Sequence, residues 1–369
     1  MRIVQLANFY SPTSGGLRTV VDTLGRGYVA AGYERVLVVP GMRRERLRTD
    51  AGLVITLPGV PVSGGYRMLP RPAAVCGELA ALGDDLVLEV SDKTTLLAVG
   101  DWARDRGVPT VLLSHERLDR WIEARVPRLW RAGAGRVMAP AVRRWNRGLV
   151  NRFDALVVTS RYAEGEFAGL PVRALHRIPL GVDLDTFRPQ RTGHRRGPAR
   201  LVYAGRLSPE KNPRAVVGAV RELVAAGVAV RLDVYGDGPE HTALRKLARG
   251  LPVDFHGHVS DRAALARALS GSDVAFAPSV AETFGLSILE AMACGTPVLT
   301  SVTGGAPELL APGAGVAVAA TPAGLAGGVA EVLSWPVPWR RAAARERAEQ
   351  FPWSRTVDAM LELHTATRV

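Results

Sequence analysis

The sequence predicts an α/β protein of two domains, each a doubly wound parallel sheet with helices on its faces. Short runs rich in β-branched residues alternate with longer helical patterns from end to end, which is typical of parallel strands joined by crossover helices. The 369 residues exceed the size at which one hydrophobic core usually keeps growing, and a hydrophobic fraction of 47% suffices for two cores. We therefore expect two Rossmann-like domains with an interdomain cleft.

The first domain is expected to span residues 1–180. Its strand candidates are short and apolar, and the segments 17–31 and 94–106 between them have helical spacing. The expected strands are residues 3–7, 35–39, 86–90, 110–113, 155–159 and 175–178.

The second domain is expected to span residues 181–352. A polar, Arg-rich stretch with prolines, residues 185–199, lacks apolar periodicity and is typical of a linker. Helices are expected over residues 213–226, 262–269 and 286–293. The expected strands are residues 201–203, 230–235, 253–255, 274–277, 297–300 and 315–318.

Composition excludes several classes of function. The formal net charge of +12 suits a polyanion, but the sequence has no zinc-ligand spacing, RNP-type aromatic run or basic heptad region, so nucleic acid is not an expected partner. Cys76 and Cys294 cannot build a disulfide framework or a zinc site. The apolar run at residues 1–7 is too short for a signal peptide, and the longest uncharged stretch, 309–330, contains two prolines and is a poor membrane span. We expect a cytoplasmic protein.

One basic segment, Arg117 to Arg152, carries ten arginines and three tryptophans against only Asp119 and Glu123. Arginine and tryptophan together suit the boundary between lipid headgroups and water, so peripheral contact with the inner face of a membrane is one interpretation. The other interpretation is an ordinary solvated helix pair whose tryptophans belong to the core.

Two glycine-containing turns follow expected strands, where open α/β sheets bind their ligands. Gly15 and Gly16 lead into a helix, and paired glycines let backbone amides approach an anion, although a plain tight turn fits equally well. The loop at residues 205–212 carries both Arg206 and Lys211, a pair suited to a diphosphate. A solvated basic loop opening a helix at Pro213 is the alternative.

Two other polar turns have simpler local explanations. His256 and His258 are two residues apart with no third ligand in view, so they are only a weak indication of a metal site. Asp261 is placed to cap the following helix. Asp183 and Asp185 resemble a metal-holding pair, but they follow a Gly-Val turn and indicate turn and cap chemistry. We predict no metal site and no metal requirement.

The most informative segment is residues 282–290, in which two carboxylates bracket a Gly-containing turn that opens an apolar helix. It offers Glu282 as a free carboxylate in a loop, the amides of a helix N-terminus, and Glu290 about two turns along that helix. Polyols and phosphates are the ligands that such a set binds.

Taken together, these motifs resemble retaining glycosyltransferase family 4, whose fold is GT-B, and especially its actinobacterial mannosyl- and glucosyltransferases. The resemblance covers nearly the whole chain. It rests on residues 15–16, 181–183, 205–211, 236–240, 257–259, 282–290 and 304–308.

The resemblance implies that the second domain binds a nucleoside-diphosphate sugar, while the first binds the acceptor and receives the C-terminal helix, residues 353–369. Arg206 and Lys211 would hold the diphosphate, Glu282 the donor sugar and Glu290 the ribose. His115 matches the family's active-site histidine, and a polar histidine closing a strand is the alternative. The other implied donor contacts are Gly15, Gly16, Gly257, His258, Val259, Phe284, Gly285 and Leu286.

The activity so implied is metal-independent hexosyl transfer with retention, without a cofactor. GDP-mannose is favoured over UDP-glucose, and the acceptor is open among lipids, glycans and small molecules. A GT-B phosphorylase, a sugar-nucleotide epimerase and an inactive binding relative are the alternatives.

Overall fold

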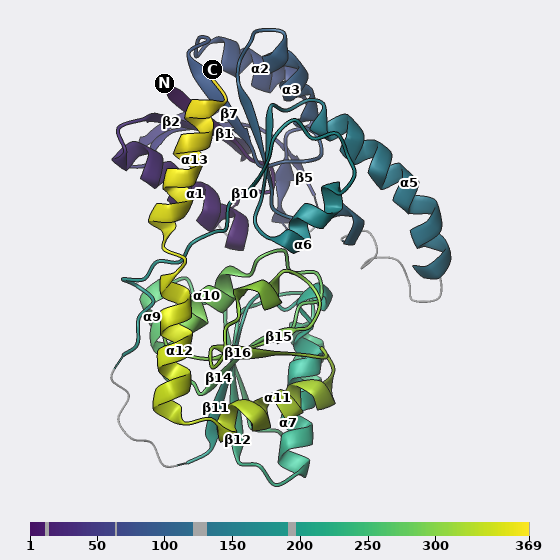
Figure 1. The fold of residues 1–369 in the computed structure, drawn as a ribbon, viewed down its shortest axis with the longest axis vertical. Helices are drawn as coiled ribbons and strands as arrows, with labels where there is room; N and C mark the ends of the chain where they lie inside the picture. The colour runs from purple at the N-terminus through teal and green to yellow at the C-terminus, as the bar shows by residue number, and fades with distance from the viewer. Residues whose placement is uncertain (12–14, 63–64, 121–130, 191–196, 369) are drawn as a thin grey trace. The chain divides into compact units, whose positions relative to one another are not determined.

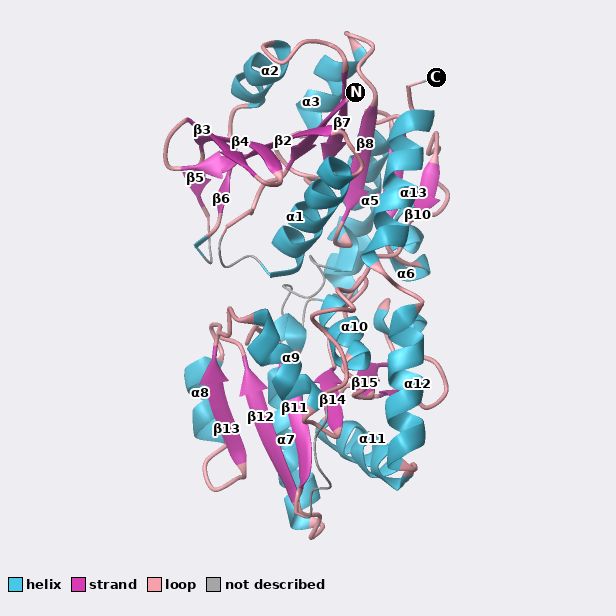
Figure 2. Cartoon of the chain, turned by 90° about the vertical axis from the view of Figure 1, so that its left-hand side faces the viewer, coloured by secondary structure: helices cyan, strands magenta, loops and turns pink. Residues whose placement is uncertain are grey.

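The computed structural model describes residues 1–11, 15–62, 65–120, 131–190 and 197–368, and its contacts divide the chain into two compact units (Figure 1). Unit 1 comprises Met1–Leu180 and Trp353–Val369, and unit 2 comprises Gly181–Pro352. Each unit is a mainly parallel sheet flanked by helices (Figure 2), which confirms the predicted α/β class.

The sheet of unit 1 is parallel apart from one antiparallel edge strand. Its order is β10-β9-β8-β7-β1-β2-β4-β3, and only β3 runs antiparallel to its neighbour. The order reverses between β1 and β7, where ligand sites of open sheets form. The strands are β1 Arg2–Leu6, β2 Glu34–Gly41, β3 Glu45–Thr49, β4 Gly52–Pro58, β7 Leu86–Val90, β8 Thr110–Ser114, β9 Ala155–Val158 and β10 Leu175–Arg177.

Helices cover both faces of this sheet because its strands are apolar on both sides. Val4 and Leu6 of β1 belong to the core beneath α2, α3 and α5, whereas Ala7 belongs to the core beneath α1. The C-terminal helix α13 packs on α1, and Figure 1 shows the two side by side. The helices are α1 Gly15–Ala30, α2 Pro72–Ala80, α3 Leu97–Arg104, α5 Arg131–Val150, α6 Arg161–Glu164 and α13 Trp353–Ala366.

The strand predictions for unit 1 were incomplete, because they left out the region between β2 and α2. That region holds β3 and β4 together with the small ribbon of β5 Val60–Pro61 and β6 Arg67–Met68. Every residue of β3 is exposed, so it carries no apolar alternation from which a strand could be predicted.

Unit 2 is a six-stranded, fully parallel sheet in the order β13-β12-β11-β14-β15-β16. The chain order reverses between β11 and β14, so the loops that follow these two strands are neighbours. The strands are β11 Ala199–Ala204, β12 Val230–Tyr235, β13 Val253–Gly257, β14 Val274–Ala277, β15 Val298–Ser301 and β16 Gly315–Val318.

The helices of unit 2 form two layers around this sheet. Buried side chains of α7, α8 and α11 share one core with β11, β12 and β14, while α9, α10 and α12 pack against one another. The helices are α7 Pro213–Ala225, α8 His241–Leu247, α9 Arg262–Ser270, α10 Leu286–Ala293, α11 Pro322–Ser334 and α12 Val337–Glu349.

Candidate functional site

The loop after β11 is held in place by backbone bonds to the loop after β12. Leu207 N donates to the Asp237 carbonyl, and Glu240 N donates to the Leu207 carbonyl, both at 2.9 Å. Gly236 makes this possible because its φ is +136° and a Cβ there would lie 1.9 Å from the carbonyl oxygen of Gly205. The glycines of the 236–238 turn therefore shape the loop that carries Arg206.

The two predicted phosphate-binding cations lie on this loop. Arg206 is exposed, and its carbonyl accepts a hydrogen bond from the buried Tyr203 hydroxyl at 2.9 Å. Burial raises the pKa of Tyr203, so that this hydroxyl stays a donor. Lys211 ends a single 3-10 turn, Pro209–Lys211, and Asn212 follows with a left-handed φ of +53°.

Glu282 is not the free carboxylate that the sequence suggested. Its Oε2 lies 2.6 Å from Lys211 Nζ, so the acid after β14 and the cation after β11 form an ion pair across the switch point of the sheet. That prediction was wrong because the partner is 71 residues away and only the sheet order makes the two loops neighbours. The pair leaves 37% of the Lys211 side chain and 19% of the Glu282 side chain exposed.

Gly285 makes the sharp entry into α10. Its φ is +102°, and Phe284 before it is buried and meets Phe351 edge-on at 6.3 Å. Gly305 N donates to the Glu282 carbonyl at 2.6 Å, which fixes the backbone beside the acid. Leu286 then begins α10, so the helix N-terminus opens directly beside the Lys211–Glu282 pair.

Glu290 lies only about one turn along α10, because the helix begins at Leu286, and it is buried and paired with a residue that sequence reasoning missed. Its Oε1 lies 2.6 Å from an Nη of Arg262, the first residue of α9, and that guanidinium also covers the Phe187 ring at 4.7 Å. Burial raises the pKa of Glu290, although Arg262 opposes the shift. No sequence signal links residues 262 and 290, because their pairing depends on how α9 packs on α10.

The loop predicted to face a nucleobase lies after β13. The Gly257 carbonyl accepts from Gly236 N at 2.7 Å, Val259 is half-buried, and His258 is exposed. His256 Nε2 lies 2.7 Å from Asp233 Oδ1, and its ring stacks on Tyr235 with centroids 4.5 Å apart. His256 therefore has a carboxylate and an aromatic partner.

The two capping predictions are confirmed. Asp261 accepts a hydrogen bond from Ala263 N at 2.8 Å and caps α9. Asp183 accepts from the backbone N–H groups of Asp185 and Thr186, which is turn chemistry. Within the described residues, no group of three or more His, Cys, Asp or Glu side chains could hold a metal ion.

His115 lies in unit 1, directly after β8. Its Nε2 is 3.0 Å from Ser91 Oγ in the loop after β7. Burial lowers the pKa of His115 from 6.5 to about 4; Glu89 opposes this shift and Lys93 adds to it. The imidazole is therefore neutral at physiological pH. Gly15 and Gly16, also in unit 1, are the exposed first residues of α1.

The basic segment is only partly described, since residues 121–130 lie outside the described residues. In the second half of α5, Arg143, Arg144 and Arg147 are exposed. Trp145 is 43% exposed, so it is not the core residue of the alternative interpretation. None of the described helices is both long and apolar enough to cross a membrane.

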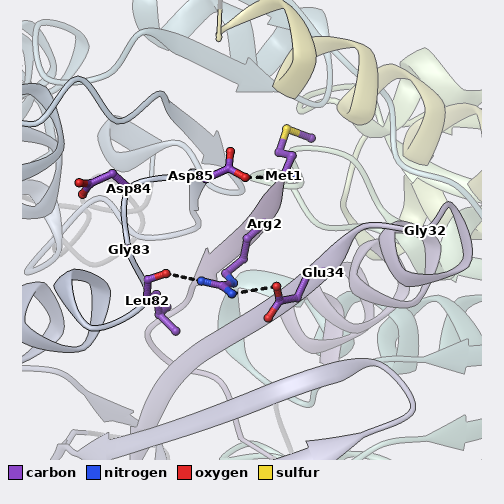
Figure 3. A pocket seen from close by; sticks show the side chains of 8 residues that line it. All are labelled: Met1, Arg2, Gly32, Glu34, Leu82, Gly83, Asp84 and Asp85. Atoms are coloured by element: carbon purple, nitrogen blue, oxygen red, sulfur yellow. Dashed lines mark hydrogen bonds and ion pairs between the residues drawn. The ribbon is translucent and has the colours of Figure 1, made fainter.

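A cavity of about 430 Å³ lies at the opposite end of the unit 1 sheet, at the amino ends of β1, β2 and β7 (Figure 3). The Arg2 guanidinium crosses the cavity and lies 2.8 Å from the Glu34 carboxylate. Open α/β sheets bind their ligands at the carboxyl ends of the strands, whereas this cavity lies at the amino ends. We do not assign it to the site. It is lined by Met1, Arg2, Gly32, Glu34, Leu82, Gly83, Asp84 and Asp85.

The fold and these loops are those of a class of α/β proteins, in which the carboxyl ends of the strands at the switch point, here β11 and β14, suit an anionic, hydroxyl-rich ligand. Comparison with known proteins agrees. Residues 185–351 match the family described as "Glycosyl transferases group 1", and residues 14–186 match "Glycosyltransferase Family 4".

Two mycobacterial relatives are similar over most of the chain. A GDP-mannose-dependent alpha-(1-6)-phosphatidylinositol dimannoside mannosyltransferase of Mycobacterium tuberculosis is 43% identical, covering 98% of this chain and 95% of the relative. A GDP-mannose-dependent alpha-mannosyltransferase of Mycolicibacterium smegmatis is 28% identical over 85% of this chain and 82% of its own. The chain belongs to glycosyltransferase family 4 and is a glycosyltransferase.

Solved structures share the GT-B fold. Sucrose-phosphate synthase from Thermosynechococcus elongatus superposes with a TM-score of 0.81 at 20% identity, covering 99% of this chain and 98% of that one. Anabaena HepE in complex with UDP-glucose gives a TM-score of 0.76 at 19% identity over 99% of this chain and 100% of that one. The family does not favour the phosphorylase, epimerase and inactive alternatives.

Proposed function

We propose that this glycosyltransferase moves mannose from GDP-mannose, with retention and without a metal ion, to a lipid-linked acceptor. The observation that carries the proposal is the 43% identity, along 98% of the chain, to a GDP-mannose-dependent enzyme that is named for its action on phosphatidylinositol dimannoside. The exposed Arg143, Arg144 and Arg147 of α5, together with the exposed Trp145, support a lipid acceptor, because arginine and tryptophan suit anionic headgroups.

The loops of unit 2 supply the donor contacts. Arg206 and Lys211 would hold the diphosphate, and their charges would stabilise it as a leaving group. Glu282 would then accept from the sugar hydroxyls, while its bond to Lys211 sets the orientation of both side chains. Amides from Phe284 to Leu286 would meet sugar hydroxyls and phosphate.

The remaining donor contacts lie on either side of these loops. Glu290 would accept from the ribose hydroxyls, in competition with Arg262. The backbone at residues 257–259 would face the base. The amides of Gly15 and Gly16, in the first turn of α1, would approach the donor's negative charge.

The reaction would run by attack on the same face of the sugar from which the diphosphate leaves. The bond between the anomeric carbon and the diphosphate oxygen breaks, the acceptor oxygen bonds to that carbon, and the departing phosphate oxygen takes the acceptor proton. The protein's contribution is positioning and phosphate charge stabilisation. His115 would act beside the donor sugar as a neutral hydrogen-bonding group.

Donor and stereochemistry are tested together. The purified enzyme is given GDP-mannose, UDP-glucose or GDP-glucose with detergent-dispersed phosphatidylinositol dimannoside, and the anomeric configuration of the product is read by NMR. We expect turnover with GDP-mannose, an α-linked product, and the same rate in excess EDTA. A β-linked product, a preference for UDP-glucose, or loss of activity in EDTA would contradict the corresponding part of the proposal.

The site assignment is tested by Lys211→Ala and Glu282→Ala, with Lys246→Ala as control because Lys246 is an exposed lysine on α8. Removing a charge-stabilising group from a transition state typically costs about 10²- to 10³-fold in kcat, and we expect losses in this range for both variants. Full turnover by both would show that these residues do not form the donor site.

Membrane contact is tested by flotation with liposomes that contain anionic lipid. We expect the protein to float with them, and the triple variant Arg143→Ala, Arg144→Ala, Arg147→Ala to float less, since each basic residue near such a surface contributes about 1 kcal/mol. An unaltered protein that stays at the bottom of the gradient would sink this idea.

A further inference from the structure

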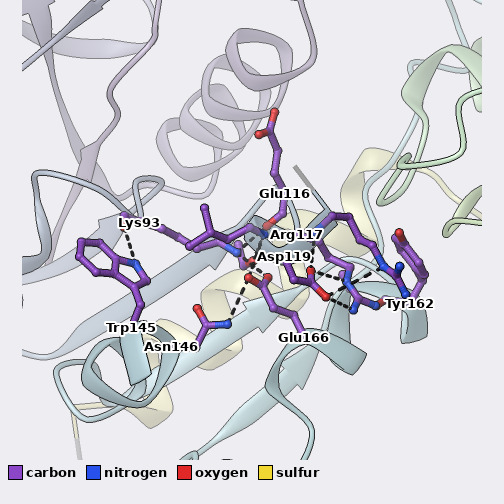
Figure 4. Close-up of polar contacts among 12 residues, drawn as sticks. Lys93, Glu116, Arg117, Asp119, Trp145, Asn146, Tyr162 and Glu166 are labelled. Atoms are coloured by element: carbon purple, nitrogen blue, oxygen red, sulfur yellow. Dashed lines mark hydrogen bonds and ion pairs between the residues drawn. The ribbon is translucent and has the colours of Figure 1, made fainter. Parts of the chain in front are cut away.

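A buried ion pair lies beside His115 and has no place in the donor site. Lys93, in the loop after β7, has its Nζ 2.7 Å from Oε2 of Glu166, which belongs to the 3-10 turn Gly165–Phe167 (Figure 4). The two side chains are only 11% and 1% exposed. Such a buried pair is seldom worth more than a well-packed apolar pair, so stability alone does not account for it.

Both members of the pair bind the loop that carries His115. Lys93 Nζ donates to the Glu116 carbonyl, one residue past the histidine. Glu166 Oε1 accepts from Leu118 N at 2.9 Å, and Asn146 of α5 donates to the same oxygen at 3.3 Å. The pair therefore fixes the loop backbone at two points within three residues of the imidazole.

A second contact set holds the far end of the same loop. Arg117 pairs with Asp119 at 2.5 and 3.0 Å, donates to the Tyr162 carbonyl at 2.7 Å, and lies over the Tyr162 ring at 4.5 Å. The neighbouring loop after β7 is held as well, because the indole N–H of Trp145 in α5 donates to the Lys93 carbonyl at 3.2 Å. Figure 4 shows these side chains converging from α5, α6 and the loops after β7 and β8.

Two charged side chains, Lys93 and Glu89, act on His115. Lys93 is the positive group beside it, and the buried carboxylate of Glu89 on β7 is the negative one. Glu89 itself is bonded to Tyr28 of α1, Gln5 of β1 and His364 of α13. Removing the Lys93 charge therefore removes a cation that opposes the effect of Glu89 on His115.

We infer that Lys93 and Glu166 are positioning residues, which hold the loop at residues 115–119 and through it the imidazole of His115 at the reacting sugar. The inference rests on the proposed function, which places His115 beside the donor sugar. The ion pair fixes the loop. Burial keeps the imidazole neutral, and the Lys93 ammonium adds to that effect.

The test uses Lys93→Met, Lys93→Arg and Glu166→Gln in the full chain, with Lys246→Met as control. We expect kcat to fall about 10- to 100-fold in Lys93→Met and Glu166→Gln, the size of effect that a misplacement of about 1 Å can have, while the donor KM changes less than about threefold. Lys93→Arg should recover most of kcat, because arginine keeps the charge and can donate to the same oxygens. Unchanged kcat in folded Lys93→Met and Glu166→Gln would overturn the inference.

Histidine-selective ¹³C NMR separates position from charge. The His115 signal is assigned with His115→Gln, and its titration is followed in each variant. We expect His115 to stay neutral down to about pH 5 in the unaltered protein and in Glu166→Gln, and to titrate at higher pH in Lys93→Met, which lacks the ammonium. An unmoved titration in Lys93→Met would overturn the assigned role of the charge.

The two proposals fail in different ways. If His115→Gln keeps full kcat, the catalytic place of His115 is wrong, whatever the NMR titrations show. If His115→Gln is inactive but both pair variants keep kcat, the positioning role is wrong and the proposed function stands. Should Lys93→Met fail to fold, Glu166→Gln carries the same kinetic test because its amide preserves the shape of the side chain.

Discussion

Glu290, which we propose binds the ribose of the donor, has a cost to the stability of the fold. It is buried in α10 and paired with Arg262, and burial raises its pKa. An acid whose pKa is raised by folding stabilises the protein below its unfolded pKa and loses that contribution as the pH rises through the folded value. Ionised Glu290 therefore lowers the free energy of unfolding at neutral pH.

We predict that Glu290→Gln is at least as stable as the unaltered protein at pH 7 but binds the donor worse. The amide cannot ionise, so the stability gain should shrink as the pH falls toward about 4.5 and be absent below it, where the unaltered carboxyl is protonated in both states. Urea unfolding at pH 7 and pH 4 measures the effect on stability. The KM for GDP-mannose measures the effect on donor binding, and we expect it to rise about tenfold. An identical pH dependence for both proteins would contradict this account.

Gly236, in the turn that shapes the loop carrying Arg206, allows a test of steric strain. Gly236→Ala should lower the free energy of unfolding by about 2 kcal/mol or more and disturb donor binding, because its φ is +136° and the new Cβ would overlap the Gly205 carbonyl. Gly227→Ala is the control, since it has a φ of +75° but open space around the Cβ position. Its cost should stay near 1 kcal/mol, and equal costs would mean that φ alone matters.

At the scale of residues, the sequence placed the proposed donor-binding side chains in turns after strands, but it did not indicate the partners of those side chains. Arg206, Lys211 and Glu282 were identifiable because each stands in a turn after a predicted strand. Arg262 was not, because a single arginine in a sequence rich in arginine carries no signal until α9 is placed against α10. Lys93 and Glu166 were missed for the same reason, as they meet across 73 residues.

At the scale of elements, the C-terminal helix α13 is fastened to unit 1 by a buried polar network. His364 Nε2 lies 3.0 Å from Glu89 Oε2, and Tyr28 of α1 donates to that same oxygen at 2.6 Å. Gly27 lets the helices approach, because a Cβ there would lie 2.5 Å from a Val357 methyl. The 353–369 segment thus contributes a histidine to the core of unit 1.

We predict that Glu89→Gln loosens α13. Burial alone would raise the pKa of Glu89, but His364, Tyr28 and Gln5 together lower it, so its stabilisation is present above about pH 4.5 and is lost at lower pH. The variant should lose about 3 kcal/mol of unfolding free energy at pH 7 and exchange the amides of α13 and α1 faster.

The deficit of Glu89→Gln should shrink as the pH falls below about 4.5, since the unaltered carboxyl then becomes protonated. Glu362→Gln, at an exposed position of the same helix, is the control and should change neither stability nor exchange. A deficit that is constant from pH 4 to pH 7 would show that the lost stability is not electrostatic.

Elements were predictable where both ends carried a signal. Helix α10 was predicted at its observed bounds because Gly285 opens it and Gly295 follows it. Four strands, β7, β12, β14 and β16, were also predicted at their observed bounds, because each is a short, mostly apolar run. The edge strand β3 was not, since its side chains are solvated and it is defined by pairing with β4. Edge strands depend on backbone bonds that the side-chain pattern does not record.

At the scale of the whole molecule, the two units have separate hydrophobic cores, and the side chains predicted to contact the diphosphate and ribose all lie in unit 2. A ligand that binds only the folded state stabilises what it binds by an amount set by its concentration relative to Kd. GDP should therefore act first on unit 2.

We predict that GDP at 100 times its Kd raises the unfolding free energy of unit 2 by about 2.7 kcal/mol. In hydrogen exchange the strongest protection should fall on residues 205–211 and 282–290, while β1, β2 and β4 of unit 1 should change little. Lys211→Ala, compared at the same GDP concentration, should lose most of this protection because it removes a diphosphate contact, whereas Lys246→Ala should keep it. Protection spread equally over both units, or retained in Lys211→Ala, would mean that the nucleotide does not bind where the loops of unit 2 place it.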